Sequence, residues 1–223
     1  MTDYNVLDLF AGLGGFSSAF ADSDRWNVTT VEIEERFNPD IQADIFDLRP
    51  SDFDTDFDVV LASPPCYQLS PAGNHDNWDF EHRQATADDS KNAVALFHHT
   101  VGLIHGLAPQ YYFIENPRNS RIRWTYGDPD EWVTYCQYGR HYQKPTALWG
   151  EFPPMTFNRC VNDANCHEKN TPTDGTQAIA SMDNIGQAER SKVPYELSKA
   201  IRDACEAGLD GDVAEQSGLE AFE

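Results

Sequence analysis

The sequence predicts an α/β protein built around a doubly wound, mostly parallel β-sheet. Two observations favour this fold class. First, short apolar segments typical of strands alternate with longer segments typical of helices. Second, three polar residues that stand out against this pattern, Glu32, Cys66 and Glu115, each fall at the end of a predicted strand. Ligands of doubly wound sheets bind beyond the carboxyl ends of the strands, so we expect a functional site at that edge.

Continuous apolar and β-branched runs predict strands over 5–10, 26–34, 58–63 and 111–116. A further short sheet position is expected just before Asp44. Helices are predicted over 15–22, 90–108 and 193–207. The second helix has apolar residues at helical spacing and ends at Pro109, and the third has Pro194 in its first turn.

The pattern changes in the C-terminal part of the chain. From residue 138 to 186 Pro, Asn, Thr and Gly are frequent and apolar periodicity fades, which predicts a compact irregular segment. The end of the chain from Gly208 has five acids and no base, which is typical of disorder. We therefore expect an α/β domain over 1–147, an insertion over 148–187, a helix over 188–207 that returns to the first domain, and an acidic tail over 208–223.

The net charge of −21, from 37 acidic and 16 basic residues, is unusual for a polyanion-binding protein. It indicates either a high-salt cytoplasm, where the Debye length falls to about 3 Å at 1 M, or a protein that does not touch nucleic acid. Residues 117–160 are an exception, because six bases against four acids make this stretch net positive. That stretch suits a surface that faces phosphates.

The sequence has no apolar run of roughly 18 residues and no secretory signal, so we expect a cytoplasmic protein without a membrane span. Its five scattered cysteines indicate reduced thiols rather than a disulfide framework.

A glycine-rich turn with Gly12, Gly14 and Gly15 follows the first strand and opens a helix. Glycines there let a ligand approach the backbone, and the helix N-terminus offers free N–H groups. Glu32, at the end of the next strand, can accept hydrogen bonds from both ribose hydroxyls of an adenosine, and Asp44 can accept one from the adenine amino group. By themselves these residues fit a nicotinamide cofactor, S-adenosylmethionine, or a structural turn followed by surface acids.

Cys66 is the sharper candidate, because it follows a strand and the rigid pair Pro64-Pro65. A cysteine at a strand end near a helix N-terminus is a candidate for a lowered pKa, although most lone cysteines are inert. Glu115 ends a strand expected to lie nearby. Partial burial beside a thiolate would raise the pKa of this carboxyl and let it donate a proton to a ring nitrogen.

The chain resembles the DNA (cytosine-5) methyltransferase family. In that family the order is a glycine-rich F-x-G-x-G-G, an acid after the second strand, P-P-C-Q-x-F-S-x-A-G, E-N-V, Q-x-R-x-R, a variable target-recognition region and a closing N-x-V-P-P helix. Over roughly residues 4–205 the sequence has, in the same order, FAGLGGF, Glu32, PPCYQLSPAG, ENP and SKVP. The resemblance implies a Rossmann-like fold of S-adenosylmethionine-dependent methyltransferases with a small irregular target-recognition insertion.

The resemblance also implies an activity: methylation of cytosine C5 in double-stranded DNA, with S-adenosylmethionine as cofactor. Cys66 corresponds to the nucleophile that adds to cytosine C6, and Glu115 to the acid at N3. The target base must leave the duplex for this chemistry. The implied cofactor contacts are Phe10, Gly12, Gly14, Gly15, Glu32, Ile33, Asp44, Ile45, Pro64 and Ser191. The implied nucleic-acid contacts are Ser70 and Gly73, in a segment that corresponds to the family's mobile loop, with Arg118, Arg140 and Lys144.

The chain departs from the family pattern in several places. Tyr67 replaces Gln after the nucleophile, and ENP replaces ENV. The Q-x-R-x-R motif fits worst, and either Lys144 or Arg140 can take the role of holding cytosine O2. Arg118 either lies near phosphates or is a solvated loop residue.

The recognition region is short and contains Cys160, Cys166 and His167. Such a C-x5-C-H cluster can bind zinc, with Cys136 or His141 as a fourth ligand, but the sequence alone favours unreactive thiols without a metal.

Three other functions compete with DNA methylation. They are methylation of RNA by the same chemistry, a DNA-docking and cofactor-binding protein without turnover, and a nicotinamide enzyme, which would leave SPPC and ENP unexplained. The oligomeric state cannot be read from the sequence, and a monomer is favoured.

Overall fold

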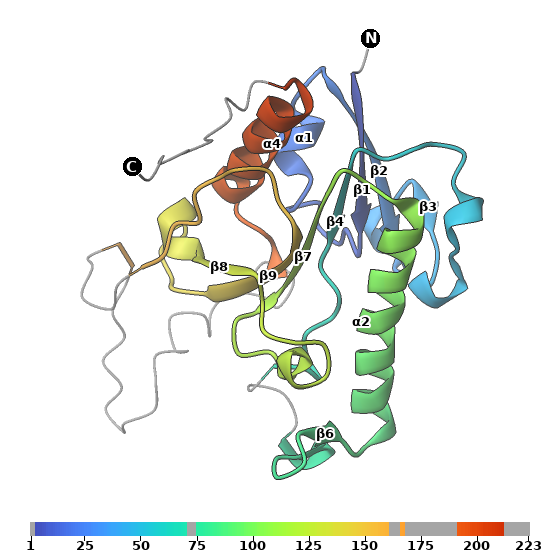
Figure 1. Ribbon diagram of the computed structural model, residues 1–223, viewed down its shortest axis with the longest axis vertical. Helices are drawn as coiled ribbons and strands as arrows, with labels where there is room; N and C mark the ends of the chain where they lie inside the picture. Colours follow the sequence, from blue (N-terminus) through green and yellow to red (C-terminus); the bar gives the residue numbers. More distant parts are fainter. Residues whose placement is uncertain (1–2, 71–74, 161–165, 168–190, 212–223) are drawn as a thin grey trace, which may run out of the picture.

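A computed structural model describes residues 3–70, 75–160, 166–167 and 191–211. Its centre is a seven-stranded sheet in the order β3-β2-β1-β4-β7-β9-β8 (Figure 1). The strands are β1 (Tyr4–Leu9), β2 (Trp26–Glu32), β3 (Ile41–Gln42), β4 (Val59–Ala62), β7 (Tyr111–Pro117), β8 (Glu131–Thr134) and β9 (Pro145–Glu151). The α-helices of the described ranges are α1 (Ser18–Ala21), α2 (Asp88–Leu107) and α4 (Tyr195–Leu209).

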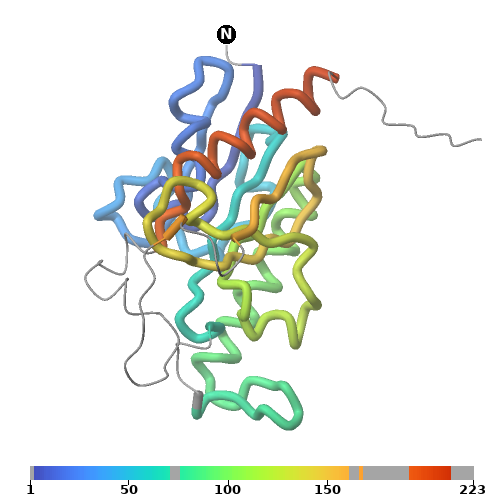
Figure 2. Tube along the Cα trace, turned by 90° about the vertical axis from the view of Figure 1, so that its left-hand side faces the viewer, coloured from blue at the N-terminus to red at the C-terminus, as the bar shows by residue number. Residues whose placement is uncertain are grey.

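Shorter elements connect these strands and helices. The 3-10 helices are η1 (Glu35–Phe37), η2 (Ile45–Asp47), η3 (Pro50–Asp52), η4 (His75–Asn77), η5 (Arg121–Trp124) and η6 (Tyr135–Tyr138). A small antiparallel hairpin joins β5 (Trp78–Asp79) to β6 (Gln84–Ala85) before α2. In Figures 1 and 2 this hairpin lies at the end of the molecule opposite the N-terminus.

Strands β3, β2, β1, β4 and β7 pair in parallel, which confirms the predicted doubly wound, mostly parallel sheet. The chain starts at β1, moves outward through β2 and β3, and then crosses to β4 on the other side of β1. The strand order therefore reverses between β1 and β4. Doubly wound sheets bind ligands in the crevice at such a switch point.

The two faces of the sheet are covered by different helices. Successive strand residues point to opposite faces, so two neighbouring residues of β1 show which helices cover each face. Leu7 belongs to the core cluster that contains Phe97 of α2. Its neighbour Val6 belongs to the cluster that contains Phe20 of α1 and Leu197 of α4. Figure 1 accordingly shows α2 on one side of the sheet and α1 with α4 on the other.

Strand β9 corrects the prediction of irregular structure from residue 138 to 186. It pairs antiparallel with β7 and with β8, so the sheet continues beyond residue 147, where we expected the insertion to begin. The strand was missed because its central residues are buried on both faces, which leaves no apolar–polar alternation to recognise.

The helix predictions need smaller corrections. Only four residues of the predicted helix 15–22 are helical, because the glycine-rich segment before α1 forms turns. Helix α4 continues to Leu209, into the predicted tail. Residues 212–223 and most of the predicted recognition region, including 168–187, lie outside the described residues. Within the described ranges, no helix is long and apolar enough to cross a membrane.

Candidate active site

The glycine-rich turn leads from the end of β1 into α1 and contacts the end of β2. Phe10, Gly12 and Gly14 have φ values of 63°, 50° and 65°, in the left-handed region that favours glycine. This path lets the Gly12 N–H donate to Oε2 of Glu32 at 3.0 Å. At Gly15 a Cβ would lie 2.5 Å from Cγ of Lys192 and 2.8 Å from the backbone nitrogen of Val193. Only glycine therefore allows the segment before α4 to close over the turn.

A cavity of about 530 Å³ lies at this switch point, in the size range of small-molecule sites. Of the residues predicted to contact a cofactor, it is lined by Phe10, Gly12, Gly15, Glu32, Ile33, Asp44, Ile45 and Ser191. Gly14 lines a second cavity that shares Gly12 and Glu32 with the first. Pro64 does not line either cavity, whereas its neighbour Pro65 lines the larger one. Pro64 is buried, and its carbonyl accepts a hydrogen bond from Nδ2 of Asn116 at 2.9 Å.

The cavity is lined by four acidic residues, and the sequence analysis did not identify two of them, Asp8 and Glu34. Asp8 of β1 is fully buried, and burial raises its pKa to about 7. Its Oδ2 accepts a hydrogen bond from Oγ of Ser17 at 2.6 Å, and its Oδ1 has no partner among the described residues. An acid inside the apolar run NVLDLF was a signal in the sequence. The lining holds four acids against two bases, Arg36 and Lys192, so its excess of acids favours a ligand that carries positive charge.

Cys66 and Glu115 lie at the carboxyl ends of neighbouring parallel strands. Strands β4 and β7 are in register, with Ala62 opposite Ile114, so Glu115 continues β7 beside the turn that carries Cys66. The hydrogen bond from Asn116 to Pro64 ties this turn to β7. Ser63 and Pro65 line the large cavity, which places Cys66 directly beside it. The fold therefore brings together the two residues that the sequence singled out.

The environment of Cys66 contradicts the prediction of a lowered pKa. Burial raises the pKa of this thiol, and the nearby charge of Glu115 raises it further. The Lys144 ammonium acts in the opposite direction. The prediction was wrong because the strand end is more enclosed than the sequence indicated, so the burial cost of a thiolate exceeds the help from the nearby cation.

Glu115 is held by two groups from the C-terminal part of the sheet. The Tyr135 hydroxyl donates to Oε1 of Glu115 at 2.9 Å, and Nζ of Lys144 lies 3.3 Å from the same oxygen. The structure thus brings Lys144, and not Arg140, to Glu115. Arg140 instead reaches the segment before α4, where its Nη2 donates to the Lys192 carbonyl at 3.4 Å. Tyr135 was missed, because no motif or spacing in the sequence marks it.

A buried arginine holds the segment that follows Cys66. The Arg121 N–H donates to the Leu69 carbonyl at 2.7 Å, and its Nη1 donates to the Ser70 carbonyl at 2.9 Å. Burial lowers the pKa of this guanidinium. Ser70, predicted to contact nucleic acid, is buried at this junction, and Gly73 lies outside the described residues. Arg121 is thus a positioning residue that the sequence analysis did not identify.

The positive stretch 117–160 is less available to phosphates than predicted. Arg121 is buried, and Arg123, Lys144 and Arg159 form ion pairs with Asp128, Glu115 and Glu131. Arg118 differs, because it is exposed and its guanidinium stacks 3.6 Å above the Trp132 ring. The net charge of the segment was therefore a poor guide, since folding pairs most of its bases internally.

The predicted cysteine and histidine candidates lie together on one side of η6. Cys160, Cys166 and His167 gather around Cys136, whereas His141 is exposed and outside this group.

Comparison with known proteins agrees with this geometry. The sequence model of C-5 cytosine-specific DNA methylases matches residues 4–121, more than half of the chain. The "Probable DNA (cytosine-5)-methyltransferase" of Frog virus 3 is 26% identical over 216 residues, covering 90% of this chain and 99% of that protein. The type II methyltransferase M.DdeI of Desulfomicrobium norvegicum is 30% identical over 125 residues, which is 50% of this chain but only 27% of that protein.

A solved structure, the methyltransferase EhMeth of Entamoeba histolytica, aligns with a TM-score of 0.46 and 14% identity, over 72% of this chain and 58% of that chain.

The family model covers the whole glycine-rich turn, the turn that carries Cys66, and Glu115. The chain therefore belongs to the family of C-5 cytosine-specific DNA methylases and is a DNA (cytosine-5)-methyltransferase.

Proposed function

We propose that the protein methylates C5 of cytosine in double-stranded DNA, with S-adenosylmethionine as methyl donor and Cys66 as nucleophile. The observation that carries this proposal is the pairing of Cys66 with Glu115 at the ends of β4 and β7, beside the cavity at the switch point. A thiol and a carboxyl at these two neighbouring strand ends can act on one pyrimidine ring, the thiol at C6 and the carboxyl at N3.

The cavity residues fit S-adenosylmethionine. Glu32 offers carboxylate oxygens for ribose hydroxyls, and Asp44 offers one for an adenine amino group. The unpaired Oδ1 of buried Asp8 and the other acids of the lining suit the positive sulfonium and ammonium groups. When bound, the cofactor supplies an electrophilic methyl group that the cytosine C5 carbon accepts.

The residues of the chain would activate the ring as follows. The Cys66 thiol would first lose its proton to the solvent; the thiolate would then form a bond to C6, and the electrons of the C5–C6 double bond would become available at C5. Glu115 holds a proton at ring N3, which neutralises the charge that the addition develops. Lys144, next to Glu115, is placed to donate a hydrogen bond to the ring O2. A solvent base would then take the proton from methylated C5, and the C5–C6 double bond would form again as Cys66 leaves as the thiolate.

The substrate must be a base that has left its duplex, because Cys66 has to approach the face of the ring. The exposed guanidinium of Arg118, stacked on Trp132, is placed to contact a backbone phosphate near the site. The net charge of −21 opposes DNA binding at low ionic strength. We therefore propose that the enzyme works in concentrated salt, where this repulsion is screened.

The test is transfer of a labelled methyl group from S-adenosylmethionine to unmethylated duplex DNA, at low and at molar KCl, beside Cys66→Ala. We expect label at cytosine C5 with the wild type, more of it at molar KCl, and none with the variant. A parallel reaction with RNA distinguishes the nucleic acids. If the protein binds the cofactor but labels no DNA at any salt concentration, the proposal is wrong.

A further inference from the structure

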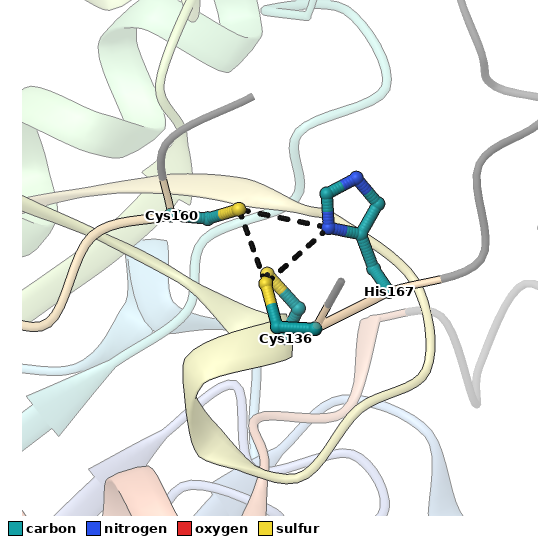
Figure 3. A group of neighbouring side chains, drawn as sticks. Cys136, Cys160 and His167 are labelled. Carbon is teal, nitrogen blue, oxygen red and sulfur yellow. Dashed lines mark hydrogen bonds between the residues drawn. The ribbon is translucent and has the colours of Figure 1, made fainter. Parts of the chain in front are cut away.

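Four potential metal ligands from three separate segments meet beside η6. Cys136 lies in η6, Cys160 follows β9, and Cys166 and His167 come from the adjoining segment. All four ligand atoms lie within 4.8 Å of one another. Figure 3 shows Cys136, Cys160 and His167 with their sulfur and nitrogen atoms pointing toward a common centre. Their convergence cannot follow from sequence proximity, because Cys136 is 24 positions before Cys160.

Three distances within the group match those between ligands of a tetrahedral metal ion, and a fourth, between the Cys160 and Cys166 sulfurs, is shorter. Around zinc, bond lengths of about 2.3 Å to sulfur and about 2.05 Å to nitrogen place neighbouring ligand atoms roughly 3.6–3.8 Å apart. Here Sγ of Cys166 lies 3.7 Å from Sγ of Cys136, and Nδ1 of His167 lies 3.6 Å and 3.5 Å from the sulfurs of Cys160 and Cys166. The Cys160 and Cys166 sulfurs are 3.2 Å apart, much longer than a disulfide bond of about 2.05 Å.

We propose that Cys136, Cys160, Cys166 and His167 bind one Zn²⁺ ion in a closed, structural Cys3His site. Four protein ligands leave no open position, which is typical of structural rather than catalytic zinc. The surrounding backbone supports this role, because the Cys160 N–H donates to Oγ1 of Thr134 at 2.6 Å and the Asn158 N–H donates to the Tyr138 hydroxyl at 3.0 Å. The ion would join the segment after β9 to η6.

The position of the site also suggests what the ion stabilises. Cys136 directly follows Tyr135, whose hydroxyl holds Glu115. Zinc bound at Cys136 would fix η6 and with it the tyrosine beside Glu115. This consequence rests on the proposed function, whereas metal binding itself does not, so the two are tested by separate measurements.

The first experiment measures zinc by mass spectrometry in protein purified under reducing conditions. We expect about one zinc per chain in the wild type and loss of most of it in Cys166→Ser and His167→Ala. His141→Ala is the matched control, because His141 is an exposed histidine near η6 outside the group, and it should keep its zinc. Wild-type protein without zinc, or zinc lost equally from His141→Ala, would overturn the proposal.

A second experiment uses only the wild type, so that a misfolded variant cannot imitate the result. A strong chelator should make three additional thiols reactive toward a thiol reagent and lower the melting temperature by at least about 5 °C. Replacement with Co²⁺ should produce the absorption bands of tetrahedral cobalt bound to thiolates. Thiols equally reactive with and without chelator, or a Cys160–Cys166 disulfide in the reduced preparation, would rule out the site. The link to Tyr135 is tested by methyl transfer in the chelated wild type. A reduced rate with unchanged cofactor binding would support the link, and an unchanged rate would contradict it.

Discussion

The two parts of the sheet contribute to the candidate site in different ways. In the parallel part, from β1 to β7, the candidate side chains lie at or near the carboxyl ends of strands: Glu32 ends β2, Cys66 lies in the turn after β4, and Glu115 lies near the end of β7. In the antiparallel part, β8, η6 and β9 supply Tyr135 and Lys144, which contact Glu115 from the side. The parallel part, which the family model matches, thus holds the proposed reacting groups, and the antiparallel part contributes to their environment.

The largest effect is expected where the two parts meet, at Glu115. Glu115→Gln keeps the shape of the side chain but cannot exchange a proton with ring N3. We expect methyl transfer to fall by about 10²–10⁴-fold, the usual contribution of an acid–base group. Single-turnover rates on duplex DNA give this value. Cofactor affinity should not change, because the cavity lining does not include Glu115, and a rate within threefold of the wild type would contradict its role.

Tyr135→Phe tests whether the antiparallel part acts through Glu115. The change removes one hydroxyl that donates to a buried carboxyl, an interaction of about 1.5–3 kcal/mol, so a loss of roughly 10- to 100-fold in rate is expected. Tyr142→Phe is the matched control, since the Tyr142 hydroxyl is buried and has no partner among the described residues. Equal losses in both variants would indicate general disturbance of the sheet rather than positioning of Glu115.

Lys144→Gln tests whether the antiparallel part influences the pKa of Cys66, through the pH dependence of the thiol's reactivity. Lys144 lowers the pKa of Cys66, whereas burial and Glu115 raise it. Without the ammonium the thiol pKa should rise further, so less thiolate exists at neutral pH and the reaction recovers only at higher pH. The rate of Cys66 alkylation against pH measures this directly. Lys199→Gln, a change on the exposed face of α4, should leave the midpoint unchanged, and an unshifted Lys144→Gln profile would refute the coupling.

The smallest effect is expected at the surface, at Arg118. Arg118→Ala should weaken duplex DNA binding similarly for all sequences, and the slope of log affinity against log salt should become more positive by about one, because one phosphate contact is lost. Arg123→Ala is the control, because Arg123 is already paired with Asp128. Titration of labelled duplex DNA at several KCl concentrations measures both slopes. The same slope in wild type and Arg118→Ala would exclude a phosphate contact there.

Much of the parallel part was predictable, because its signals are local. Apolar strands, the glycine turn and Pro64-Pro65 before Cys66 specify where the chain turns, and parallel pairing then places the strand ends at one edge. These features predicted the fold class, and eight of the ten predicted cofactor contacts line the cavity. Asp8 was overlooked, although an acid within an apolar strand was visible in the sequence.

The antiparallel part depends on contacts between residues far apart in sequence. Tyr135 has no motif of its own, and the sequence left Lys144 and Cys136 as one of two candidates each. Only the pairing of β9 with β7 and β8 carries these residues to their partners. The raised pKa of Cys66, and the ion pairs of three bases between 117 and 160, likewise depend on which segments pack together. The sequence by itself determined the fold class and the candidate reacting residues, because chain-local patterns encode strand ends. Burial, ion pairing and the four-ligand cluster were decided by the tertiary structure, because they depend on which segments pack together.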